Sequence, residues 1–294
     1  MSKNSAMRRR DLSLVFFTLL AQCSIGIVLW LMLLALITGQ RPVSAETGLA
    51  PGNPVLLALL LVVLATTMSF LHLGNPRSAP RAIRNLATSW LSREILAIGL
   101  FTVCLLLAFL TGWRTGAAGF AGLLLLPAAL AGLFLLWTMS GVYSIVTVPS
   151  WNSAHTPIGF TLATLSLGAV SCLLLAVAGT IEVESFALDL CAATWLATLL
   201  LEAGTSLANQ RRLEKMDTGF RGPAFRHGML RGGFLARGGV LLLTALGIAV
   251  LLLQPGAAFA PDHSGWIYPL LILGVVQEFI GRILFYASYF RLGL

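Results

Sequence analysis

Charged side chains are scarce in this sequence. Asp, Glu, Lys and Arg make up 10% of its 294 residues, and its mean hydropathy is +0.89. Soluble domains average about 25% charged residues, so this chain has too few polar groups to cover a water-facing surface. The composition therefore excludes a soluble globular protein and predicts an integral membrane protein.

Long polar stretches are also missing, because apolar runs follow one another along the whole chain. The bilayer core of about 30 Å needs about 20 helical residues to cross it, and lipid cannot satisfy the open backbone groups of isolated strands. We therefore predict one domain over residues 1–294, an all-α bundle of eight transmembrane helices with both termini on the same side. The predicted spans are 12–38, 54–73, 93–111, 117–143, 158–179, 186–207, 233–254 and 266–290.

The first of these runs also resembles a secretory signal, because it follows the basic start "MRRRDLSLVFF". The apolar core of a signal peptide is only about 7–15 residues long, and this run is much longer. We expect it to be retained as the first span.

Cysteines are few and widely separated. Cys23, Cys104, Cys172 and Cys191 fall in or beside apolar runs, without C-x-x-C or C-x-x-H spacing. This pattern excludes a zinc site or an iron–sulfur cluster built from this chain alone. We expect the four thiols to pack at helix interfaces.

Histidines are equally few. Only His72 falls at a span, whereas His155, His227 and His263 are predicted to lie in connections. Membrane b-type haem is commonly held by two histidines on facing helices. We therefore expect no haem in this chain.

The basic residues are unevenly distributed between the predicted connections. Nearly all of them fall on one side of the membrane, whereas Arg41 and Arg114 fall on the other. The positive-inside rule then places both termini in the cytoplasm. A basic face that docks an acidic partner is the competing explanation. The chain has no basic folded domain, so nucleic acid is not expected as a partner.

A few ionisable residues fall inside the predicted spans, where an unpaired charge is costly. Glu278 and Arg282 are four residues apart and are predicted to form an ion pair on one helix face. Glu202 is predicted to hydrogen-bond to a neighbouring helix or to extend towards the membrane surface. Arg237 is predicted to reach the interface.

One segment gathers polar residues at the junction of two spans: "MSFLHLGNPRSAPRAIRNLATSWLSREI", residues 68–95. His72 ends the second span, and "GNP" stops that helix. Arg77, Arg81 and Arg84 are spaced four and three apart, so a short interfacial helix would present them on one face.

The second half of this segment begins the third span. Ser89 or Ser92 is expected to cap that helix, whose first turns contain Arg93 and Glu94. The chain doubles back, so the His72 imidazole and the Glu94 carboxyl group are predicted to come close together. Taken singly, each residue also has a purely structural explanation. Together they supply what quinol oxidation requires, namely hydrogen-bonding groups and bases that accept protons near neutral pH.

The segment "FLHLGNPRSAPRAIRNLATSWLSREI" resembles a segment of the membrane anchor subunit of dimethyl sulfoxide reductases. The resemblance continues in "FFTLLAQCSIGI", "VYSIVTVPSWNSAHTPIGF" and "QEFIGRILFY", in the family's order, from residue 16 to residue 286. It implies that the chain oxidises menaquinol. The electrons would pass to an iron–sulfur subunit with 4Fe–4S clusters and then to a catalytic subunit with a molybdenum cofactor.

The resemblance also assigns residues. The family's histidine and glutamate at the quinol site fall on His72 and Glu94, where they would accept the protons. Arg77 and Arg81 would orient the quinol head group or contact the iron–sulfur subunit, which we expect to dock on the basic segments 77–93 and 211–231. Four further positions match the family: Gln22, Tyr143, Glu278 and Arg282.

Two other functions remain open from the sequence. Glu202 and Glu278 would suit a secondary transporter, although the polar cluster lies at the membrane edge and no internal repeat is evident. A purely structural tether would have no quinone site. The terminal electron acceptor and the direction of electron flow are not encoded in this chain.

Overall fold

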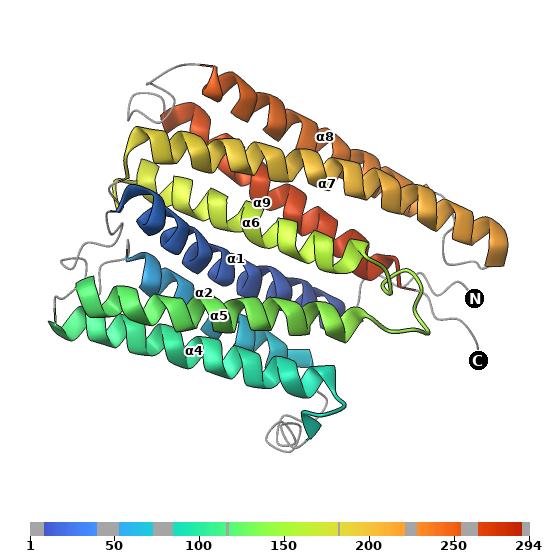
Figure 1. Cartoon of the computed structure of the whole chain (residues 1–294). Coiled ribbons are helices and arrows are strands. Elements are labelled where there is room, and N and C mark those ends of the chain that lie inside the picture. The colour runs from blue at the N-terminus through green and yellow to red at the C-terminus, as the bar shows by residue number, and fades with distance from the viewer. Residues whose placement is uncertain are drawn as a thin grey trace.

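The computed structural model describes residues 9–39, 53–72, 85–115, 118–181, 183–220, 228–253 and 264–289. Within these ranges the chain forms eight α-helices and no β-strand. Successive helices run in opposite directions and pack side by side in a bundle (Figure 1). The helices are α1 (Arg9–Thr38), α2 (Pro54–His72), α4 (Trp90–Thr115), α5 (Ala118–Tyr143), α6 (His155–Val177), α7 (Ser185–Phe220), α8 (Gly228–Leu252) and α9 (Ser264–Ala287). The prediction of an eight-helix membrane bundle is confirmed.

Seven of these helices contain a long apolar stretch that can cross a bilayer, and α2 contains a shorter one, Pro54–Phe70. The 19 residues of α2 span about 28 Å at 1.5 Å per residue. This length is close to the thickness of the hydrocarbon core. We therefore count α2 among the membrane helices.

Helix α7 is longer than its apolar stretch predicts. The predicted span ends at residue 207, but the helix continues to Phe220 and has 36 residues, which corresponds to about 54 Å. Residues 208–218 contain neither glycine nor proline, so nothing in them stops the helix when it leaves the membrane. In Figure 1, α7 extends beyond its neighbours at one end of the bundle.

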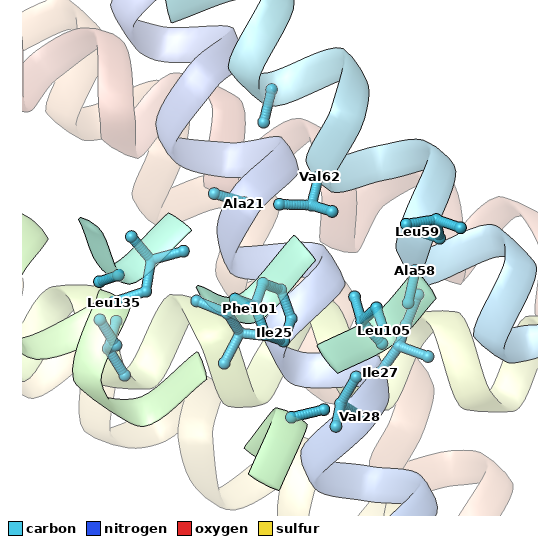
Figure 2. Close-up of a cluster of buried hydrophobic side chains, with 14 of the residues drawn as sticks. Ala21, Ile25, Ile27, Val28, Ala58, Leu59, Val62, Phe101, Leu105 and Leu135 are labelled. Atoms are coloured by element: carbon cyan, nitrogen blue, oxygen red, sulfur yellow. The ribbon is translucent and has the colours of Figure 1, made fainter. Parts of the chain in front are cut away.

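Helix α1 lies in the middle of the bundle and contacts helices on both sides, including α2, α5, α6 and α9. One apolar core joins α1 to α2, α4 and α5, and Figure 2 shows side chains of this core, with Ile25 of α1 beside Phe101 of α4. A second core joins α6, α7, α8 and α9, to which α1 contributes Trp30 and Leu34. All four cysteines are free and are buried or half-buried, as predicted for packing residues.

Two glycines allow α1 and α6 to cross closely. A Cβ atom on Gly26 would lie 2.7 Å from Cα of Gly168, and a Cβ on Gly168 would meet the Gly26 backbone. Small residues at such crossings are typical of membrane helices, whose backbones then approach closely. One turn before Gly26, Gln22 donates through Nε2 to the Phe160 carbonyl of α6 at 2.9 Å. The crossing therefore brings a polar side chain of α1 against α6.

The helices define two ends of the bundle. At one end of the bundle, α1, α4, α6 and α8 begin and α2, α5, α7 and α9 finish (Figure 1). We call this end the basic end. The start of α1 and the finish of α9 therefore lie at the same end. Basic residues described there are Arg93, Arg211, Arg212, Lys215 and Arg231.

Candidate functional site

The start of α4 holds Glu94 inside the bundle. Ser89 caps the helix, because its Oγ accepts the backbone N–H of Ser92 at 3.3 Å. Arg93 donates to the carbonyl oxygens of Leu86 at 2.8 Å and Ala87 at 2.7 Å, so it ties the preceding turn to the helix. The capping role predicted for Ser89 is confirmed.

Glu94 itself is only 6% exposed. Its Oε1 atom has no hydrogen-bond partner among the residues that the structure describes. A buried polar atom without a partner is rare, because it loses its hydration without compensation. Glu94 is therefore a carboxyl group with an acceptor available inside the bundle, close to the basic end.

Two tyrosines lie near Glu94. The hydroxyl groups of Tyr143, the last residue of α5, and Tyr286, in the last turn of α9, are 2.6 Å apart. Both interact electrostatically with Glu94 and with Arg282. The pair therefore interacts with both the buried carboxyl group of α4 and the guanidinium group of α9.

Arg282 faces the interior of the bundle. It is 5% exposed and donates through Nη2 to Oε1 of Gln22 at 2.5 Å. Its guanidinium carbon lies 3.9 Å from the centre of the Phe160 ring, a cation–π contact that stabilises a desolvated charge. Since Gln22 also donates to the Phe160 carbonyl, the contact joins α1, α6 and α9.

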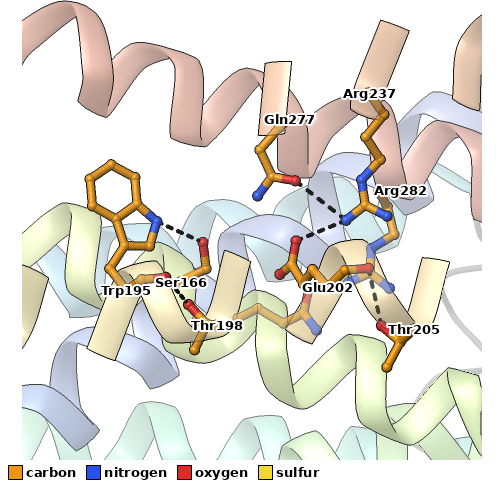
Figure 3. A network of polar contacts seen from close by, with 9 residues as sticks. Ser166, Trp195, Thr198, Glu202, Thr205, Arg237, Gln277 and Arg282 are labelled. Carbon is orange, nitrogen blue, oxygen red and sulfur yellow. Dashed lines mark hydrogen bonds and ion pairs between the residues drawn. The ribbon is translucent and has the colours of Figure 1, made fainter. Parts of the chain in front are cut away.

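A second polar cluster joins α7, α8 and α9. Arg237 of α8 donates through Nη2 to Glu202 Oε2 at 2.9 Å and to Gln277 Oε1 at 3.3 Å (Figure 3). Its side chain is 12% exposed, against 3% for Glu202. The prediction that Glu202 bonds across helices is confirmed. The prediction that Arg237 reaches the interface is wrong, because its guanidinium group points inwards and binds the buried side chains of Glu202 and Gln277.

The Glu278–Arg282 ion pair was also predicted wrongly. Both side chains are described, and they form no ion pair, although their charges attract each other. Arg282 bonds to Gln22 instead, and Glu278 lines a small cavity together with Glu202. Spacing along one helix permits a pair, but partners on neighbouring helices compete for the same groups.

Gly281 explains how Arg237 reaches its acid. A Cβ atom at Gly281 would lie 2.6 Å from Cζ of Arg237 and 2.7 Å from its Nε. The guanidinium group therefore packs directly against the backbone of α9. Only glycine leaves this space without a displacement.

The structure describes the side chains of some predicted site residues and not of others. It describes Glu94, Gln22, Tyr143, Glu278 and Arg282 and brings them into one connected polar region. The backbone of His72 ends α2, as predicted. Its side chain lies outside the part of the chain that the structure describes, as do Arg77, Arg81 and the predicted interfacial helix.

Three further residues belong to this region but were not predicted as site residues. Tyr286 and Phe160 contact Arg282 or its partners, and His155, predicted in a connection, begins α6 and lines a cavity within the bundle. A signal existed for Tyr286, because Glu278, Arg282 and Tyr286 recur every four residues and thus share one helix face. In the described part of the chain, no three His, Cys, Asp or Glu side chains are grouped to hold a metal ion.

The sequence matches known proteins over almost its whole length. Residues 7–288 match the family model of the DMSO reductase anchor subunit (DmsC). The sequence is 29% identical to one of the polypeptides of the anaerobic dimethyl sulfoxide reductase of Escherichia coli strain K12, over 96% of each protein.

Two further relatives match over about half of their length. The corresponding polypeptide of the Haemophilus influenzae anaerobic dimethyl sulfoxide reductase is 31% identical over 55% of this protein and 56% of that one. A sulfite dehydrogenase subunit of Allochromatium vinosum is 32% identical over 56% of this protein and 54% of that one. With eight membrane helices and a family match from residue 7 to residue 288, the chain belongs to the DMSO reductase anchor subunit family.

Proposed function

We propose that this chain oxidises menaquinol at the basic end of the bundle and passes the electrons to an iron–sulfur partner subunit. The observation that carries the proposal is the buried Glu94 carboxyl group, whose Oε1 is unpaired among the described residues. Helix α2 contacts α4, and α2 ends at His72 at the same end where α4 begins. Membership of an anchor family supports the proposal.

Quinol oxidation at this site requires two bases, one for each proton released. Oxidation of a quinol to a quinone releases two protons and two electrons. Each quinol hydroxyl group donates a hydrogen bond, so the site needs two acceptors. Glu94 Oε1 is one available acceptor, and the His72 imidazole is the second base in this proposal. Arg77 or Arg81 would orient the head group, and the electrons leave to metal clusters held by the partner.

The partner is proposed to dock at the basic end. The relatives are each named as one polypeptide of a reductase or dehydrogenase, which implies a larger assembly. Arg211 on the extended part of α7 and Arg231 near the start of α8 are both exposed there. Docking at this end keeps the distance from quinol to cluster short. A molybdenum-cofactor subunit would then reduce the terminal acceptor.

The orientation follows from charge. The positive-inside rule places the basic end, and with it both termini, on the cytoplasmic side of a bacterial inner membrane. The relatives named above are all bacterial proteins.

The test uses the assembled complex in membranes, and its readout does not depend on the terminal acceptor. Reduced menaquinone analogue is added, and reduction of the iron–sulfur clusters is followed by electron paramagnetic resonance. We expect Glu94→Gln and His72→Gln to slow this reduction by about 100-fold or more, since general bases contribute factors of this order.

Dithionite provides the control, because it reduces the clusters without the quinol site. Both variants should retain the soluble subunits on the membrane and respond normally to dithionite. Unchanged reduction by quinol in both variants would favour the structural tether. Solute uptake by vesicles that contain only this chain would favour the transporter.

A further inference from the structure

A small polar cavity lies between α6, α7, α8 and α9. Its volume is about 40 Å³, and its polar lining includes His155, Glu202, Thr205, Arg237, Glu278 and Arg282. One water needs about 10–15 Å³ of such volume, so the cavity has room for a few waters and for nothing larger. Two arginines in the lining also make a metal cation unsuitable as an occupant.

Several buried atoms in this lining have no hydrogen-bond partner among the described residues. They are Oε1 of Glu202, Oε1 of Glu278, Nε of Arg237, Nε of Arg282 and Nδ1 of His155. Glu202 and Glu278 are each 3% exposed. Donors and acceptors thus face one small space, which is the arrangement that binds water and protons.

The two carboxyl groups are the centre of the cluster. Both line the same small cavity, and two carboxylates in one buried space repel each other unless one of them holds a proton. Arg237 binds Glu202 Oε2 at 2.9 Å, which leaves Oε1 of each acid available to share that proton.

Two acids and two arginines line this cavity, so their charges can balance. With both acids ionised, the two acids and the two arginines are neutral together, and one proton gives the cluster a charge of +1. The other titratable group at the cavity is His155 of α6.

His155 gives the cavity a connection to the basic end. It is the first residue of α6 and is only partly buried, whereas Glu278 lies nine residues before the end of α9, Ala287, or about 14 Å into the helix. Arg282 in the lining interacts electrostatically with Tyr143 and Tyr286, which in turn interact with Glu94.

We propose that Glu278 and Glu202 form an internal proton-binding site that exchanges its proton with the basic end through water in the cavity and past His155. In a role that rests on the proposed quinol oxidation, the site is an outlet for the proton that Glu94 receives. No metal or redox group is needed for this transfer.

The experiment is infrared spectroscopy of the assembled complex in H2O and D2O. A protonated carboxyl group gives a C=O band that shifts in D2O. Since the proposal assigns the proton to the pair, we expect Glu278→Gln and Glu202→Gln each to remove one such band. The matched control Glu214→Gln, on the exposed part of α7, should leave it unchanged. A normal thermal transition will show that each variant is folded.

Exchange is the second measurement. His155→Phe should slow the D2O shift of this band about tenfold or more, as expected when a proton-relaying group is lost. A band that persists in Glu278→Gln would overturn the proposal, and so would a band that does not exchange in the unmodified complex. His155→Leu repeats the exchange test if His155→Phe does not fold.

The two proposals fail separately. If Glu94→Gln still oxidises quinol but the Glu278 band behaves as expected, the quinol site is wrong and the proton site stands. If Glu94→Gln loses quinol oxidation but the band does not depend on Glu278, the proton site is wrong. Glu278→Gln should slow quinol-driven cluster reduction about tenfold if the site is the outlet.

Discussion

The hydroxyl groups of Tyr143 and Tyr286 are 2.6 Å apart inside the bundle and join the end of α5 to the last turn of α9. Both residues are buried, at 6% and 7% exposure. Around them, the rings of Trp151 and Phe285 stack at 5.4 Å, and Trp151 also donates through Nε1 to the Phe285 carbonyl at 2.8 Å. This contact fixes the connection after α5 against α9, at the end where we place the quinol site.

The first prediction concerns this pair. Tyr143→Phe should lower the free energy of unfolding by about 1–3 kcal/mol, because it leaves the Tyr286 hydroxyl buried without its partner. The double variant Tyr143→Phe/Tyr286→Phe should be less destabilised than the sum of the two single variants, since it removes both polar groups. Thermal unfolding in detergent measures this, and strict additivity would show that the two hydroxyls do not depend on each other.

The second prediction concerns the space that Gly281 leaves for Arg237. Gly281→Ala should displace the guanidinium group from Glu202 and Gln277 and destabilise the protein by about 3 kcal/mol, the order expected when a buried ion pair is broken. Gly204→Ala on α7 is the matched control, because a Cβ there meets no atom within 4 Å. That control should change stability by less than about 1 kcal/mol. Equal effects of the two substitutions would contradict the packing that we describe.

The third prediction concerns the docking surface. The double variant Arg211→Glu/Arg231→Glu should weaken retention of the soluble subunits about tenfold, because reversed charges at an interface rim repel an acidic partner. The charge-preserving variant Arg211→Lys/Arg231→Lys should retain them. Sedimentation of membranes at increasing salt measures both, and the wild-type interaction should itself weaken as salt rises. Equal retention of all three proteins would exclude these arginines from the interface.

The helices were predictable from the sequence because the bilayer imposes their length and apolar character. The extension of α7 was not, since hydropathy reports where lipid ends and not where a helix ends. The capping of α4 by Ser89 was predictable because it depends on neighbours in the chain.

The partners of the buried charges were much harder to predict. Spacing identifies Glu278 and Arg282 as neighbours on α9, but Arg282 bonds to Gln22 of α1. Glu278 instead lines a cavity together with Glu202 of α7. The inward direction of Arg237 depends on a glycine more than 40 residues away, at position 281. The partners of these buried side chains are determined by packing between helices, and a local sequence pattern does not encode that packing.

The unbroken course of α7 has a mechanical consequence. Arg211, on the part that extends at the basic end, and Glu202, in the middle of the same helix, belong to one continuous rod. A continuous helix tilts and rotates as one rigid unit. A subunit that binds the outer turns of α7 and tilts the helix would therefore also shift the Glu202 carboxylate relative to Arg237 and Glu278. Assembly of the complex would then be coupled to the charges inside the membrane through a single rigid helix.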